Sequence, residues 1–167
     1  MLYTNKTNIN RNQLTLNHKW NLKDNLSVEQ TIHNANYNRK YKVSNSDGSL
    51  STEDITEEKN SEYELLFNYS FSNYLFNGGI EFSNPEYKSD RIKGGAQQKN
   101  ILGVFNQVAW NISNQINIVS GFRFDAYGDT TVISPRLALS FKNNDRWTYR
   151  LAYGHGFRAP SFMESLI

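Results

Sequence analysis

Apolar and polar residues alternate along much of this chain with a period of two. The clearest case is residues 63–71, where Tyr63, Leu65, Phe67, Tyr69 and Phe71 are separated by mostly polar neighbours. Since successive side chains of a β-strand point to opposite faces, this pattern predicts strands with one apolar and one polar face. Helical periodicity is hard to find anywhere in the chain. The sequence therefore predicts an all-β fold of antiparallel strands.

We predict eight such strands, joined by connections that alternate in length. The strands cover approximately residues 9–20, 26–32, 62–71, 74–83, 102–112, 116–125, 136–142 and 147–154. Short polar turns are expected at 21–25, 72–73, 113–115 and 143–146, and longer loops at 44–60, 84–99 and, less extended, 127–131. Short turns at one end and long loops at the other are typical of bacterial outer-membrane barrels, whose long loops face outwards.

The composition favours strands that separate an apolar medium from water. Hydrophobic residues make up 38% of the chain and the mean hydropathy is −0.68, yet aromatic residues reach 14%. Disordered chains are poor in aromatic residues, so disorder does not explain the low hydropathy. No apolar run approaches the roughly 20 residues of a membrane-spanning helix, and an open sheet edge is unstable in lipid. A membrane location therefore requires a β-barrel.

Several function classes are disfavoured. The net charge is +2 with scattered basic residues, so no nucleic-acid partner is expected. The absence of cysteine removes disulfides and thiolate sites, and no nucleophile elbow, metal-binding histidine pair or phosphate-binding glycine loop is present. We expect no enzymatic activity and no resident cofactor or metal. The acidic residues of segment 44–60 lack EF-hand spacing and are expected in a solvated loop: Asp47, Glu53, Asp54, Glu57 and Glu58.

Large aromatic residues lie beside the predicted short turns. They are Trp20, Phe71, Tyr74, Trp110 and Trp147. Residues of this kind form girdles where outer-membrane barrels meet the lipid headgroups, so we expect them near the periplasmic surface with outer-membrane lipid as their partner. A soluble β-sandwich gives no reason for this one-sided placement. His18, Gln30 and Asn106 also fall on the apolar face, and the pattern gives no account of them.

Residues 103–164 carry an ordered set of motifs, GVFNQVAW, INIVSGFRFDAYGD and SPRLALSFKNNDRWTYRLAYGHGFRAPSFMESL. This set resembles the TonB-dependent outer-membrane receptors. The resemblance implies a transmembrane barrel of about twenty-two strands, of which residues 1–167 would supply about eight. It implies energised uptake of a small-molecule or metal-chelate cargo, such as a ferric siderophore, haem or cobalamin, across the outer membrane of a Gram-negative bacterium. The plug domain, through which such receptors contact TonB, and an export signal would both be missing from this chain.

The resemblance and the alternation together suggest candidate site residues. Arg158, with Tyr153 and His155, would lie near the outer mouth and could contact cargo; a structural role for Arg158 is the more economical interpretation. His155 is the candidate haem ligand, although the histidine of haem receptors lies beyond the segment reached here. Polar-face residues expected to line the lumen, or simply to be solvated, are Arg123, Asp125, Arg136 and Arg150.

Two other classes of protein remain as alternatives. A complete small barrel of eight strands with a structural or adhesive role has the right length. It would ordinarily carry a signal peptide and a terminal aromatic residue, neither of which is present. A soluble β-sandwich that acts as a binding module would be soluble without detergent.

Overall fold

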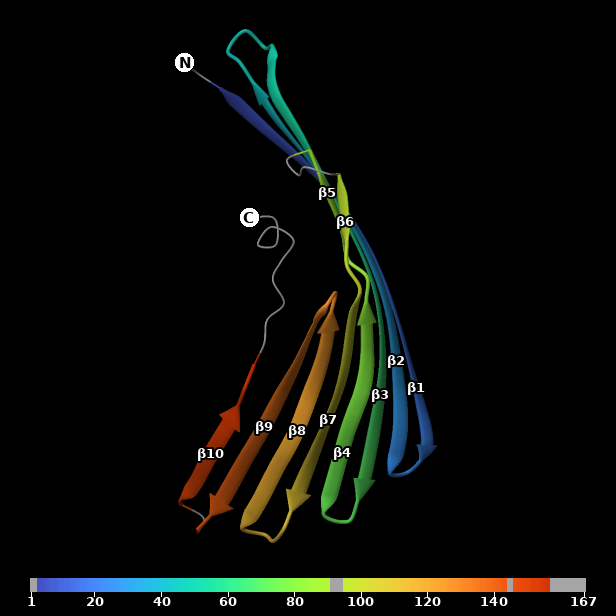
Figure 1. Cartoon of the computed structure of the whole chain (residues 1–167), viewed down its shortest axis with the longest axis vertical. Coiled ribbons are helices and arrows are strands. Elements are labelled where there is room, and N and C mark those ends of the chain that lie inside the picture. Colours follow the sequence, from blue (N-terminus) through green and yellow to red (C-terminus); the bar gives the residue numbers. More distant parts are fainter. Residues whose placement is uncertain (1–2, 91–94, 144–145, 157–167) are drawn as a thin grey trace.

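The structure is a computed structural model that describes residues 3–90, 95–143 and 146–156. All regular structure in these residues is β-strand, arranged in one antiparallel sheet (Figure 1). The strands are β1 (Thr4–Lys23), β2 (Leu26–Ser44), β3 (Leu50–Phe71), β4 (Tyr74–Ser83), β5 (Glu86–Ser89), β6 (Ala96–Gln98), β7 (Ile101–Asn111), β8 (Ile116–Tyr127), β9 (Thr130–Lys142) and β10 (Thr148–Gly154). A helix able to span a membrane is not found in this part of the chain.

The eight predicted strands are confirmed, and each pairs with its neighbours in the order β1-β2-β3-β4-β7-β8-β9-β10. The connections β1–β2, β3–β4, β7–β8 and β9–β10 lie at one end of the sheet (Figure 1). In the two-residue β3–β4 turn Ser72 has φ 47°, the left-handed conformation that tight hairpin turns require. The predicted alternation of the connections is therefore correct at this end, which we call the short-turn end.

The prediction of a long loop at residues 44–60 is wrong. Strands β2 and β3 stay paired from Leu26↔Tyr69 to Ser44↔Leu50, which leaves only a tight connection between them. Basic residues of β2 meet acidic residues of β3: Lys40 and Lys42 both contact Glu53. Both faces of this segment are polar, so it lacks the apolar alternation that identifies a strand in the sequence.

The predicted loop at residues 84–99 also contains strands. Strand β5 pairs with β3 from Thr56↔Ser89 to Lys59↔Glu86, and β6 pairs with β5. Pro85 lies between β4 and β5, which both pair with β3. It interrupts the hydrogen bonds to β3 because it has no N–H to donate. The Asn84 N–H nevertheless donates to the Ser61 carbonyl at 2.9 Å, so β5 continues the line of β4.

Strands β1, β2 and β3 are much longer than a membrane crossing requires. They contain 20, 19 and 22 residues, whereas about 9–11 tilted residues cross a bilayer. At about 3.3 Å per residue the remaining length projects roughly 30 Å. We call this part, residues 4–13, 33–61, 84–90 and 95–99, the extension; Figure 1 shows it rising beyond β4 and β7–β10.

The two faces of the sheet differ in chemistry. One register row joins six strands through Leu16, Ile32, Tyr63, Phe82, Leu102 and Ala126. We call this apolar face the outer face and the opposite one, which carries Glu29, Glu64 and Glu81, the inner face. Among the described residues four polar ones are buried, Asp54, Thr56, Ser83 and Ser89, and all lie on the inner face, which is therefore the more enclosed.

The apolar side chains of the outer face have no protein cover. None of the described hydrophobic residues is buried, and Leu14 and Leu151 are 70% and 72% exposed. A side chain of this kind gains about 1.5–3 kcal/mol on leaving water, so a face of this extent requires an apolar medium. No second sheet packs on it in the described residues, which contradicts the β-sandwich alternative.

The sheet is open. Strands β1 and β10 stand at opposite ends of the strand order, and no pairing in the described residues joins them. A complete eight-stranded barrel would pair these two strands. The structure thus corresponds to part of a barrel wall and not to a small closed barrel.

Candidate functional site

An ion-pair network centred on Arg123 lies on the inner face near the end of β8. The Arg123 Nη2 atom is 2.9 Å from Glu81 Oε2, and its Nε donates to the two carboxylate oxygens of Asp125 at 2.8 and 3.0 Å. The guanidinium carbon lies 5.7 Å from the centre of the Phe105 ring. Because Glu81 belongs to β4, Arg123 reaches across the whole width of β7.

Gly103 makes that crossing possible. It pairs with both Glu81 and Asp125, so it occupies the position on β7 over which the arginine passes. A Cβ atom at residue 103 would lie 2.5 Å from Arg123 Nη2 and 3.1 Å from its Cζ. A side chain at residue 103 would therefore displace the end of the guanidinium that reaches Glu81.

Two further glycines of the inner face lie beside side-chain contacts. Arg136 of β9 donates to Gln107 of β7 across Gly121 of β8, which pairs with both. The Phe105 ring lies against Gly79, where an added Cβ would come within 2.8 Å of the ring. Glycine inside a strand often marks a close approach of another group. The strand glycines were therefore a sequence signal for these contacts that the prediction did not use.

The predicted lumen residues do share the inner face. Arg123, Asp125 and Arg136 are held by the contacts described above. Arg150 pairs with Ser140 in the sheet, and its side chain makes no ion pair or hydrogen bond with any residue that the structure describes. Glu81, which completes the network, was not among the predicted site residues, although it lies on the polar face of its strand.

Of the three candidate cargo contacts, the structure describes Tyr153 and His155. Tyr153 pairs with Leu137 on the outer face and is 70% exposed. The His155 N–H donates to the Pro135 carbonyl at 3.0 Å. The residue borders a hollow of about 310 Å³ that Arg123 and Arg136 also line. Arg158 lies outside the described residues.

The predicted girdle residues lie at the short-turn end. Tyr74 and Trp110 pair in register and stack, with ring centres 5.4 Å apart and planes at 14°. Phe71 pairs with Tyr74 across the turn. Trp20 packs against His18 at 4.0 Å between ring centres, which gives this unexplained histidine an aromatic neighbour. Trp147 precedes β10 and is 62% exposed.

One aromatic pair at this end was not predicted as part of the girdle. Phe141 and Tyr149 stack with ring centres 6.4 Å apart. They pair across the β9–β10 hairpin, next to its short turn. Tyr149 lies on the outer face close to the turn, and this position is the sequence signal that could have found it.

The extension carries a second hollow, of about 440 Å³, on its inner face. Its lining includes Arg11, Tyr37, Arg39, Asn60 and Tyr87. Arg39 lies 3.5 Å from Asp54 Oδ2, and Asp54 is only 2% exposed. Arg39 Nε and Asn60 Oδ1 are buried with no hydrogen-bond partner among the described atoms. Leaving such atoms unpaired costs about 1–3 kcal/mol each.

The acidic residues of segment 44–60 are engaged by protein groups. The hydrogen bond from Lys40, together with the charge of Lys42, holds the pKa of the Glu53 carboxyl below its ordinary value. Ser49 lowers the pKa of Asp47 in the same way, by donating from its hydroxyl and N–H. Within the described ranges no three histidine or acidic residues are grouped to hold a metal ion.

A single antiparallel sheet with an apolar outer face, a polar inner face and aromatic residues at one end defines the wall of a membrane β-barrel. The chain belongs to the TonB-dependent receptor family: the family model described as TonB dependent receptor-like, beta-barrel, matches residues 2–167. Comparison with curated protein sequences gave no match.

Solved structures of this architecture resemble the chain at low sequence identity. The copper transporter OprC superposes with a TM-score of 0.72 at 13% identity, over 91% of this chain and 30% of OprC. The siderophore receptor PirA from Pseudomonas aeruginosa gives 0.63 at 12%, over 92% and 34% of the two chains. PirA from Acinetobacter baumannii gives 0.54 at 12%, over 93% and 34%. The likeness shows the fold, and the chain spans about a third of each structure.

Proposed function

We propose that this chain forms part of the wall and the extracellular hairpins of an outer-membrane receptor that imports a scarce nutrient. The family match over residues 2–167 is the observation that carries the proposal. The cargo is a small molecule or metal chelate, in the class of ferric siderophores, haem and cobalamin. In this proposal residues 1–167 belong to the barrel domain, and the energy of TonB arrives through a plug domain and not through these strands.

The inner face supplies the groups for such a role. The hollow in the extension offers the guanidinium of Arg11 and the phenols of Tyr37 and Tyr87, which suit an anionic or hydroxyl-rich chelate. Further along the same face, Arg136 and His155 border the hollow of about 310 Å³. Cargo captured at the extension would pass these groups on its way inwards. The Arg123 network stiffens the wall between β4 and β8.

Uptake measurements test this function. We would delete the gene in its own bacterium, grow the cells under iron limitation, and follow labelled ferric siderophores, haem, cobalamin and copper. We expect uptake of one cargo to fall to background and to return with the intact gene. The variants Arg11→Gln and Tyr37→Phe should raise the KM of that uptake about tenfold, because each removes one polar contact.

Lys6→Gln is the matched control, because Lys6 lies on the same strand as Arg11 but on the outer face. It should transport like the original protein. Unchanged uptake of all four cargoes after deletion would contradict a receptor role.

A further inference from the structure

Two polar side chains stand side by side on the outer face of the spanning strands. His18 of β1 pairs with Gln30 of β2, and both positions belong to the face that is otherwise apolar. The rest of their register row contains only apolar residues, namely Leu65, Ile80, Val104, Phe124 and Ile133. The polar pair is therefore confined to β1 and β2.

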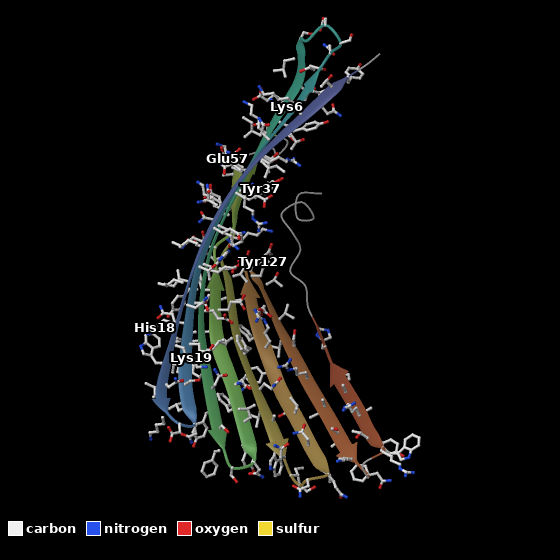
Figure 2. All side chains as sticks on the ribbon, turned by 180° about the vertical axis from the view of Figure 1, so that it is seen from behind. Lys6, His18, Lys19, Tyr37, Glu57 and Tyr127 are labelled. Atoms are coloured by element: carbon white, nitrogen blue, oxygen red, sulfur yellow. The ribbon has the colours of Figure 1, made fainter. Side chains whose placement is uncertain are left out.

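The depth of the pair places it in the hydrocarbon layer. About 9–11 tilted residues cross a bilayer. Counted along β1 from the girdle residue Trp20, they end at about Asn12. His18 is the first outer-face residue after Trp20, and Leu16 and Leu14 follow it on the same face. Figure 2 shows His18 projecting away from the sheet. In the membrane orientation of the proposed function, His18 and Gln30 thus face lipid.

The fold leaves the hydrogen-bonding groups of both side chains unused. Neither side chain forms a hydrogen bond with any residue that the structure describes, and the His18 ring lies instead against Trp20, with ring centres 4.0 Å apart. An unpaired polar group is costly in hydrocarbon, because no water replaces the missing partner. In membrane proteins, histidine and glutamine side chains hydrogen-bond across the contact between neighbouring segments. The pair therefore indicates a protein neighbour on this face.

A second copy of the same chain supplies matching groups at the matching depth. Two copies in one membrane have the same orientation, so a twofold axis that relates them runs along the membrane normal. With the axis between β1 and β2, strand β1 of each copy faces β2 of the other. His18 of one copy then lies opposite Gln30 of the other copy, and the contact occurs twice. The depths agree because the two residues share one register row.

The two side chains are complementary as hydrogen-bonding groups. A neutral imidazole has one donor and one acceptor nitrogen, and an amide has two donors and one acceptor oxygen. Each histidine therefore finds a donor or an acceptor in the amide that faces it. Trp20 and Leu16, both exposed, flank His18 on the same face and would surround the polar contact. An aromatic residue beside a shielded polar contact is typical of the centre of a protein interface.

We propose that the receptor to which this chain belongs forms a dimer in the outer membrane through the outer face of β1 and β2. In this dimer His18 of each copy is hydrogen-bonded to Gln30 of the other. Curved barrel walls touch along a narrow line, so the interface is small and the dimer depends on the membrane. The inference rests on the outer-membrane location in the proposed function but not on the identity of the cargo.

Cysteine cross-linking in outer membranes tests the contact, since the chain contains no cysteine of its own. Two differently tagged forms of the whole protein, His18→Cys and Gln30→Cys, are produced in the same cells. A mixed dimer brings the two substituted positions together and keeps the second His18–Gln30 contact intact. We expect mild oxidation to link the two forms into a dimer that carries both tags. Either form produced alone should give at least tenfold less linked dimer.

Three outcomes of the cross-linking would overturn the proposal. The first is the absence of a doubly tagged dimer when both forms are in the membrane. The second is equal cross-linking of either form alone, because position 18 would then face position 18. The third is a linked product that contains a different outer-membrane protein in place of the second copy.

Dimerisation in lipid bilayers, followed by energy transfer between labelled copies, is an independent measurement. The variant H18L/Q30L should weaken dimerisation about tenfold, the effect of two such contacts. N106L is the matched control, because Asn106 is an outer-face amide on β7, away from β1 and β2; it should dimerise within twofold of the original protein. Heat-modifiable migration checks that both variants are folded. A monomeric original protein at every density, or unchanged dimerisation of folded H18L/Q30L, would contradict the proposal.

Cargo uptake separates this proposal from the proposed function. A protein that dimerises through His18 and Gln30 but imports none of the four cargoes would contradict the receptor role alone. A protein that imports cargo but gives no doubly tagged dimer would contradict the dimer alone.

Discussion

Arg123 reaches Glu81 across a third strand because residue 103, between them, is glycine. The guanidinium occupies the space of the missing side chain, with Nη2 2.5 Å from the position that a Cβ would take. An ion pair between β4 and β8 thereby crosses β7, and it joins strands that share no backbone hydrogen bonds. Side-chain ion pairs therefore connect strands of the inner face in addition to the backbone hydrogen bonds between neighbouring strands.

The first prediction concerns this crossing. Gly103→Ala should displace Arg123 and lower the free energy of unfolding in detergent by about 1 kcal/mol, the value of one partly exposed charged hydrogen bond. Gly154→Ala is the control, since the nearest atom to its added Cβ would be 3.7 Å away. In a protein that already carries Glu81→Gln, Gly103→Ala should lower the free energy of unfolding by less. If the two substitutions lower it by fully additive amounts, Arg123 does not depend on Gly103 to reach Glu81.

A second prediction addresses the extension. Asp54→Asn leaves Arg39 without its anionic partner at a position where the carboxylate is 2% exposed. Local opening of the β2–β3 hairpin should become easier by about 1–3 kcal/mol. Trypsin should then cleave after Arg39 or Lys40 about tenfold faster or more, whereas Glu58→Gln, at an exposed position, should leave the rate unchanged. Equal rates for both variants would show that the pair does not hold the hairpin.

A third prediction is a pH dependence of the same hairpin. Lys40 and Lys42 hold the pKa of Glu53 below its ordinary value of 4.5. A depressed pKa means that the carboxylate stabilises the folded hairpin above pH 4.5 and that this contribution is lost as the pH falls through the lowered pKa. Amide hydrogen exchange in β2 and β3, corrected for intrinsic rates, should show less protection at pH 3 than at pH 6. Glu53→Gln should abolish that part of the difference.

A fourth prediction places the aromatic residues in the bilayer. Single-tryptophan variants that keep Trp20 or Trp110 should be quenched most by lipids brominated near the headgroup, because both residues lie at the short-turn end. Tyr74→Ala should loosen the Trp110 indole and increase its quenching by aqueous acrylamide. Quenching of either tryptophan by mid-chain bromine would contradict the interfacial position.

The eight spanning strands could be predicted because one of their faces is apolar, so that the chemistry repeats every second residue. The parts of β2 and β3 that lie in the extension were not predicted as strands, because neither of their faces is apolar. Lys40 and Glu53 meet on one face and Arg39 and Asp54 on the other, so both faces of these strands are polar and the sequence there resembles a loop. The sequence placed Arg123 on the correct face, but its partner on β4 depends on the register and on the space above Gly103, which no local pattern encodes.

In the proposed function the sheet stands in the outer membrane with the extension outside the cell and the short turns in the periplasm. The chain contains no cysteine, so single-cysteine variants give a clean background. Lys6→Cys, in the extension, should react with a membrane-impermeant maleimide in intact cells, and Asp24→Cys, in the β1–β2 turn, should react only after the outer membrane is permeabilised. Labelling of Asp24→Cys in intact cells with protection of Lys6→Cys would contradict the account.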